Sequence, residues 1–110
     1  MERFVKGDIV VIEFPFSDLT EVRRRPAIVI QPLEGGDIIL CQITGQEIKD
    51  RNSILIREKD FQEGRLKVDS LVRFTKLFTG DNSLIYYKAG HLKKEKMQEI
   101  TEKLCEFLRK

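Results

Sequence analysis

Apolar residues along this chain come in short runs separated by polar turns, a pattern typical of β-strands. The first two runs, residues 9–14 and 27–30, are rich in β-branched side chains, which favour strands. Residues 69–74 instead alternate, with Leu71 and Arg73 on one face and Val72 and Phe74 on the other. The pattern predicts six strands, at residues 9–14, 27–30, 38–43, 53–56, 69–74 and 84–87.

Turn-forming residues separate these predicted strands. Pro15 ends the first strand, and Thr44, Gly45 and Gln46 close the third. Two further turns are predicted at Gly35, Gly36 and Asp37, which form a hairpin, and at Gly80, Asp81 and Asn82. Residues 60–64 are also predicted as a turn.

The last part of the chain changes period and predicts one helix. Its apolar residues recur every three or four positions and form a single stripe: Met97, Ile100, Leu104, Phe107 and Leu108. Lysines and glutamates fill the other positions, so the outer face is solvated. Short strands with turns between them and one terminal helix indicate a mainly β (α+β) fold, a small, strongly bent antiparallel barrel.

Length and composition set the class of protein. At 110 residues, with 41% hydrophobic and 35% charged residues, the chain is expected to form one globular domain over residues 1–110. No apolar run approaches the roughly 20 residues that a membrane-spanning helix needs. The first six residues lack the apolar core of a signal peptide. We therefore expect a cytoplasmic protein with no membrane partner.

Charge and cysteine usage add two expectations. The formal net charge is only +2, so any affinity for nucleic acid must come from where the cations sit. Without a secretory signal, Cys41 and Cys105 are expected to be reduced and buried rather than joined in a disulfide.

Several familiar chemistries lack the necessary residues. His91 is the only histidine and has no cysteine near it in the sequence, so we interpret it as a surface or helix-start residue and predict no metal site. The carboxylates are scattered without an obvious acid/base pair. No glycine-rich phosphate loop leads from a strand into a helix, so no nucleotide cofactor is predicted.

Phosphate-binding and hydroxyl side chains gather instead at the ends of predicted strands. Arg25 precedes Pro26, which holds it in an extended conformation and leaves its guanidinium free to bind phosphate. The candidate residues are Arg23, Arg24, Arg25, Thr44, Gln46, Ser70, Arg73, Thr75 and Lys76. Together they favour a surface that binds single-stranded nucleic acid, with Phe16 or Phe74 as a stacking platform. Taken singly, each also fits an ordinary exposed loop or strand face, and Phe74 fits core packing better.

Six motifs in order resemble the MazF/PemK family, the ribosome-independent endoribonuclease toxins of type II toxin–antitoxin pairs. The first motif is Gly7 and Asp8, and the second is Arg25, Pro26 and Ala27, which lead into the second predicted strand. The remaining motifs lie at residues 42–44, at residues 69–73 and 76–79, and at residues 89–92. The resemblance spans nearly the whole chain.

This resemblance implies an SH3-like, plasmid-maintenance-toxin barrel that forms a homodimer and cleaves single-stranded RNA at short sequences. It implies that Arg25 and Thr44 form the active site and that residues 16–24 form a loop covering it. The acidic residue of that loop is Glu21 or Asp18. Where the family commonly has Gln-Ile-Arg-Thr, this chain has Leu-Val-Arg-Phe at residues 71–74, which keeps Arg73 but lacks the glutamine.

The implied reaction needs no metal, because RNA carries its own nucleophile. The 2′-hydroxyl attacks the neighbouring phosphate and leaves a 2′,3′-cyclic phosphate and a 5′-hydroxyl. Arginine stays protonated in proteins, so Arg25 is expected to stabilise charge first and donate a proton second, while Thr44 bonds a phosphate oxygen. The resemblance also implies a cognate antitoxin, with DNA bound only through it.

Two other hypotheses stay open at this stage. A short first loop and the change at Leu71 and Val72 also fit a non-catalytic barrel that binds nucleic acid or a partner peptide. A regulator that binds DNA with its antitoxin is the third hypothesis, and the small net charge gives it little support.

Overall fold

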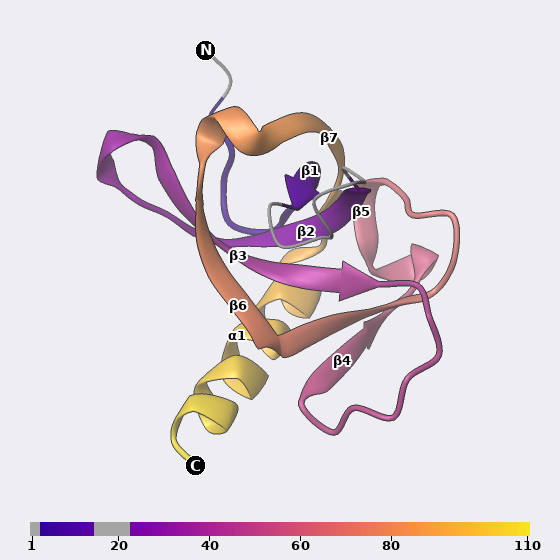
Figure 1. Ribbon diagram of the computed structural model, residues 1–110. Helices are drawn as coiled ribbons and strands as arrows, with labels where there is room; N and C mark the ends of the chain where they lie inside the picture. Colours follow the sequence, from indigo (N-terminus) through magenta and orange to yellow (C-terminus); the bar gives the residue numbers. More distant parts are fainter. Residues whose placement is uncertain (1–2, 15–22) are drawn as a thin grey trace.

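Seven strands and one α-helix make up the regular structure of residues 3–14 and 23–110, the part of the chain that the computed structural model describes. They are β1 (Asp8–Phe14), β2 (Arg23–Pro32), β3 (Asp37–Thr44), β4 (Ser53–Ile56), β5 (Phe61–Gly64), β6 (Ser70–Asp81), β7 (Ile85–Leu92) and α1 (Lys94–Leu108). Neighbouring strands run antiparallel in the order β4-β6-β3-β2-β1-β7-β5. Figure 1 shows the sheet curled into a half-barrel with α1 beside it, which confirms the predicted mainly β fold.

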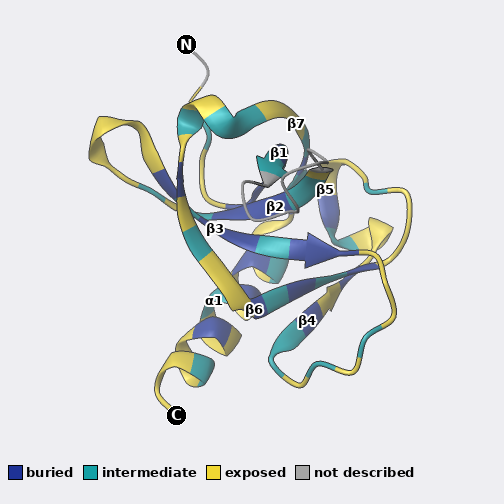
Figure 2. Ribbon diagram, viewed as in Figure 1, coloured by how far each residue is buried: buried dark blue, intermediate teal, exposed yellow. Residues whose placement is uncertain are grey.

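The sheet has a hydrophobic cluster on each face because its central strands are apolar at nearly every position. On β1, Ile9 faces the first cluster and Val10 faces the second. On β2, Ile28 belongs to the first cluster, while Ala27 and Val29 belong to the second. Continuous apolar runs, rather than alternating ones, are what a strand buried on both faces requires. Figure 2 shows this burial along β2 and β3.

Helix α1 covers the first cluster with the predicted apolar stripe. Met97, Ile100 and Leu104 are buried in it, and the Phe107 ring lies 6.3 Å from the Phe74 ring. Leu108 continues the stripe but is 61% exposed, because the helix runs past the sheet at its last turn (Figure 1). No helix of the described residues is long and apolar enough to cross a membrane.

The predicted burial of the cysteines is confirmed for Cys41 and wrong for Cys105. Cys41 lies fully buried on β3, in the first cluster. Cys105 follows Leu104 directly, and one residue of helix turns a side chain about 100° away from the sheet, so Cys105 is exposed. Both thiols are free.

Tertiary pairing lengthens several of the predicted strands. Strand β7 continues to Leu92 because β1 and β5 pair with it on both sides. The predicted turn at residues 60–64 is wrong: Phe61–Gly64 forms β5, which pairs with the outer edge of β7 and buries Phe61. Gly64 allows β5 to approach β7 closely. Its φ is 69°, and a Cβ there would collide with the backbone of Ala89 and Gly90.

The predicted turn at Gly35 and Gly36 is confirmed, whereas the one predicted at Gly80, Asp81 and Asn82 begins later, because Gly80 and Asp81 pair with β3. Gly35 and Gly36 have φ angles of 78° and 92° and lie between β2 and β3. Strand β6 ends at Asp81, and a short 3₁₀ turn at Asn82–Leu84 leads into β7.

Candidate functional site

The pairing of β2 with β3 brings Arg25 and Thr44 to the same end of the sheet. Ala27 stands opposite Gln42 in this pair, and continuing the register by two residues places Arg25 opposite Thr44. Side chains alternate along a strand, so Arg25, Ala27, Gln42 and Thr44 share one face. Neighbouring strands lie about 4.8 Å apart, so one phosphate group can contact both Arg25 and Thr44.

Strand β6 adds two residues to this face. Leu71 pairs with Thr44, and Arg73 follows two residues later on the same side of the strand. We call these side chains the Arg25 face: Arg25, Gln42, Thr44, Leu71 and Arg73. All except Thr44 are half-buried, and Thr44 is 7% exposed.

A bulge in β6 lies beside the Arg25 face. The register jumps from Ile43 opposite Val72 to Cys41 opposite Leu77, so residues 73–76 stand opposite Gln42 alone. Figure 1 shows β6 turning a corner. The bulge puts Thr75 and Lys76 in solvent next to the face. Bulges re-aim side chains and are common beside active sites.

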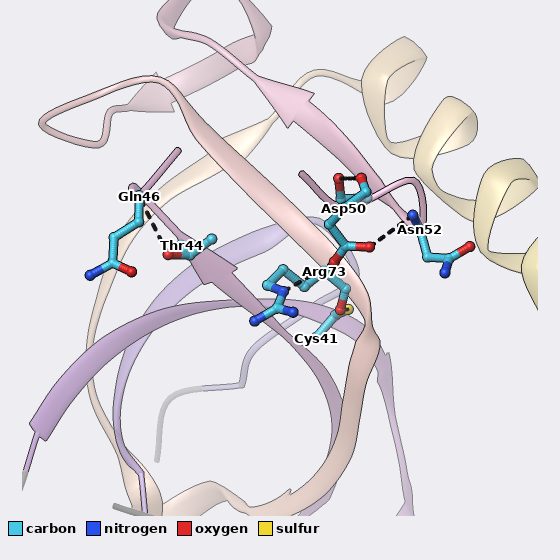
Figure 3. Close-up of polar contacts among 7 residues, drawn as sticks. Cys41, Thr44, Gln46, Asp50, Asn52 and Arg73 are labelled. Carbon is cyan, nitrogen blue, oxygen red and sulfur yellow. Dashed lines mark hydrogen bonds and ion pairs between the residues drawn. The ribbon is translucent and has the colours of Figure 1, made fainter. Parts of the chain in front are cut away.

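The Thr44 hydroxyl is oriented by the turn that follows β3. Its Oγ1 accepts a hydrogen bond from the backbone N–H of Gln46 at 3.2 Å (Figure 3). The hydroxyl hydrogen then remains for an outside acceptor. Gly45 allows a close approach here, because a Cβ would come within 2.7 Å of the Val68 side chain.

Arg73 is held from its side chain and its main chain. Its Nε donates to Asp50 Oδ2 at 3.1 Å, and its carbonyl accepts from the Cys41 thiol at 2.7 Å (Figure 3). Burial raises the pKa of the Cys41 thiol to about 12. Cys41 is therefore a protonated thiol at neutral pH and donates a hydrogen bond under Arg73. It is not a nucleophile, because only the thiolate form is one.

The three arginines at the start of β2 do not share one surface. Among the described residues, the Arg25 guanidinium has no hydrogen-bond or ion-pair partner. Arg24 points to the opposite face by alternation, and its guanidinium lies 4.1 Å from the centre of the Tyr86 ring. The Tyr86 hydroxyl donates to Glu13 at 3.0 Å. Arg23 begins β2, and its side chain is not described.

The remaining predicted residues divide into four groups. Gln46, Thr75 and Lys76 are exposed near the Arg25 face. Ser70 is 3% exposed and donates to the Val68 carbonyl at 2.8 Å, so it braces the loop packed behind Gly45. Phe74 is 3% exposed and lies in the first cluster, which favours core packing over stacking. The predictions for Phe16, Asp18 and Glu21 fall outside the described residues.

The sequence over residues 5–108 matches the family model of the PemK-like, MazF-like toxins of type II toxin–antitoxin systems. This chain belongs to that family. No curated protein sequence matches it.

Solved structures show that the family fold is shared at low sequence identity. Toxin MazF-mt6 of Mycobacterium tuberculosis superposes with a TM-score of 0.72 at 11% identity, over 93% of this chain and 96% of that one. A mycobacterial endoribonuclease in complex with its cognate antitoxin gives 0.74 at 11%, over 96% and 95%. A MazE–MazF complex from Deinococcus radiodurans gives 0.73 at 19%, over 94% of both chains.

One acid/base pair of this PemK-like chain was missed in the sequence. Asp8 is 2% exposed, and its Oδ1 lies 2.8 Å from His91 Nδ1 and 3.5 Å from Lys88 Nζ. The Glu63 carboxylate, 2.6 Å from Lys88 Nζ, raises the pKa of Lys88. Asp8 pairs with His91 at the start of β1. Ile12, the β1 residue that pairs with Arg25, lies four residues or about 13 Å further along the strand. The pair therefore fastens β1 to β7 away from the Arg25 face.

Two residues near the Arg25 face were also missed. Gln42 is two positions before Thr44, and strand alternation alone could have placed it on the same face. Asp50 reaches Arg73 across 23 positions of sequence, and no local pattern signals that contact. In the described residues, no three side chains of His, Cys, Asp or Glu group as a metal site would require.

Proposed function

We propose that this chain is a sequence-selective endoribonuclease that cleaves single-stranded RNA without a metal ion. In this proposal the RNA 2′-hydroxyl attacks the adjacent phosphate and leaves a 2′,3′-cyclic phosphate and a 5′-hydroxyl end. The observation that carries it is the pairing of β2 with β3, whose register puts Ala27 opposite Gln42 and, continued by two residues, Arg25 opposite Thr44, in a chain of the PemK-like toxin family.

Arg25 and Thr44 have complementary roles in this reaction. Negative charge builds up on the phosphate oxygens in the transition state, and the Arg25 guanidinium offers a permanent charge and several donors to them. The same guanidinium then donates a proton to the leaving 5′-oxygen and regains one from solvent, and solvent also takes up the proton that the attacking 2′-hydroxyl loses. Thr44 donates its hydroxyl hydrogen to a phosphate oxygen, while one of its two lone pairs accepts the backbone N–H of Gln46 and orients the hydroxyl.

The other cations and polar groups bind the RNA strand on either side of the scissile phosphate. Arg73, Lys76 and Thr75 surround the bulge of β6, and Gln46 lies beyond Thr44. Phe16 and Glu21 contribute from the first loop in this proposal, and Arg23 contributes from the start of β2. Arg24 steers RNA from the opposite face, and Ser70 acts indirectly through the loop that it braces.

The test is cleavage of single-stranded RNA by the pure protein in EDTA. Arg25→Ala and Thr44→Ala are each expected to lower the cleavage rate about 10²–10³-fold, the cost of losing one transition-state donor. Arg65→Ala is the matched control, because Arg65 is an exposed arginine whose pair with Glu58 is 3.9 Å long. Its rate should equal that of the wild type.

Three outcomes contradict the proposal: no cleavage by the wild type, cleavage that EDTA abolishes, or equal cleavage by wild type and Arg25→Ala. RNA binding without cleavage would favour a non-catalytic module instead, in line with the leucine that pairs with Thr44. Mapping of the product ends tests the mechanism separately, since 3′-phosphate ends without a cyclic intermediate would contradict 2′-hydroxyl attack.

The same proposal includes a homodimer and a cognate antitoxin, acting in the cytoplasm. Two of the similar solved structures are complexes of a toxin with its antitoxin, which supports such a partner here. Light scattering of the pure protein tests the dimer, and a small acidic reading frame next to the gene tests the antitoxin. DNA is expected to bind only through the antitoxin, so a specific gel shift by the isolated chain would contradict this part.

A further inference from the structure

The loop between β3 and β4 places a carboxylate against the Arg25 face. Asp50 is only 11% exposed at its side chain, and its Oδ2 accepts the Nε–H of Arg73 at 3.1 Å. A carboxylate this buried is unfavourable unless it is paired. Arg73 is its charged partner, so the contact is a partly buried ion pair and not a loose surface one.

Asp50 is itself held rigidly. Its Oδ1 accepts the backbone N–H of Asn52 at 2.9 Å, and its carbonyl accepts the Ser53 hydroxyl at 2.6 Å (Figure 3). The Asn52 carbonyl in turn accepts the backbone N–H of Phe74 at 2.8 Å. The Asp50 loop is thus tied to β6 at the residue after Arg73.

We propose that Asp50 is a positioning residue that sets the Arg73 guanidinium for RNA, an inference that rests on the proposed function. Asp50 engages Nε, and in the described residues no other side chain bonds this guanidinium. Both terminal nitrogens are therefore left to form a paired contact with a phosphate of the RNA strand. The Cys41 thiol donates to the Arg73 carbonyl and so holds the main chain of Arg73 as well.

This role predicts that loss of the Asp50 charge weakens RNA binding, whereas electrostatic repulsion alone predicts that it strengthens binding. RNA is a polyanion, so removing a nearby negative charge should by itself strengthen binding. If Asp50 positions Arg73, removing that charge weakens binding instead. Asp50→Asn is the sharpest variant, because Asn52 and Arg73 donate to different oxygens of the carboxylate, and in asparagine one of those two positions becomes an NH2 donor.

The experiment measures the dissociation constant for a fluorescent 2′-O-methyl RNA pool, whose blocked 2′-oxygens prevent cleavage. We expect Asp50→Asn to raise the dissociation constant about tenfold, as loss of one charge-assisted contact does. Glu47→Gln is the control, since Glu47 is an exposed carboxylate of the same loop. Its dissociation constant should stay the same or fall.

A double-mutant cycle separates positioning from general damage. Asp50→Asn should have no further effect in an Arg73→Ala background, because the group that it positions is gone. Equal losses with and without Arg73, or binding by Asp50→Asn as tight as the wild type, would overturn the proposal. If Asp50→Asn does not fold, as judged by its melting transition, Asp50→Glu keeps the charge on a longer arm and should bind at an intermediate strength.

The two proposals can fail separately. Wild-type protein that binds the RNA pool but does not cleave unmodified RNA would refute the ribonuclease, while the binding cycle would still test Asp50. Wild-type protein that neither binds the pool nor cleaves unmodified RNA would overturn both. Cleavage by the wild type with an unchanged dissociation constant in Asp50→Asn would refute only the role of Asp50.

Discussion

The two cysteines show how one residue type behaves differently in two environments. Cys41 is buried with its pKa raised to about 12, whereas Cys105 is exposed on α1. We expect iodoacetamide to label Cys105 in the native protein at neutral pH and to leave Cys41 unmodified until the protein unfolds. Mass spectrometry of tryptic peptides checks this, and native labelling of Cys41 would contradict its burial.

The raised pKa of Cys41 also gives a pH dependence of stability. The thiol holds its proton more tightly in the folded state, so its contribution is complete below the unfolded value of 9.0 and is lost as pH rises toward 12. Relative to Cys41→Ala, the wild-type melting temperature should therefore fall more steeply between pH 9 and pH 11. Parallel curves for the two proteins would contradict the assignment.

Site residues were predictable where a local rule governs them. Arg25 precedes a proline and Thr44 closes the third predicted strand, so their places at strand ends followed from the sequence, whereas their pairing as catalytic residues was implied by the family resemblance and stays a prediction. Asp50 could not, because its role depends on a contact between distant segments. Arg24 is next to Arg25, yet strand alternation sends it to the other face.

At the scale of elements, helix α1 is a cover for one face of the sheet. Ile100 is fully buried at its centre, so Ile100→Ala should lower the free energy of unfolding by about 2–5 kcal/mol. Lys103→Ala, at an exposed position of the same helix, should change it by less than about 0.5 kcal/mol. Urea denaturation measures both, and equal effects would contradict the packing of α1.

The elements themselves were predicted better than their lengths. Apolar runs identified the six predicted strands, but β5 was missed because only Phe61 of its four residues is buried. The extra length of β6 and β7 comes from pairing with neighbours, which sequence periodicity does not report. The bulge in β6 also breaks the alternation that the prediction relied on.

At the scale of the whole molecule, the two hydrophobic clusters share the strands β1, β2 and β3. Neither can unfold while the other stays intact, because Ile28 and Val29 face different clusters one residue apart. We therefore expect a single unfolding transition. Leu40→Ala and Ile100→Ala, which lie in different clusters, should each lower the midpoint of this single transition. In each variant the midpoints from helical circular dichroism and from tyrosine fluorescence should coincide. Separate midpoints would contradict this coupling.

The corner in β6 makes the length of this strand adjustable. Thr75 and Lys76 lie in solvent, while Val72 and Leu77 on either side of the bulge keep their own partners on β3. Adding or removing one residue at Thr75 or Lys76 would therefore leave both flanking registers in place. Chain length can thus vary next to the Arg25 face without a redesign of the core, and a library built at this corner would test whether the proposed RNA preference changes.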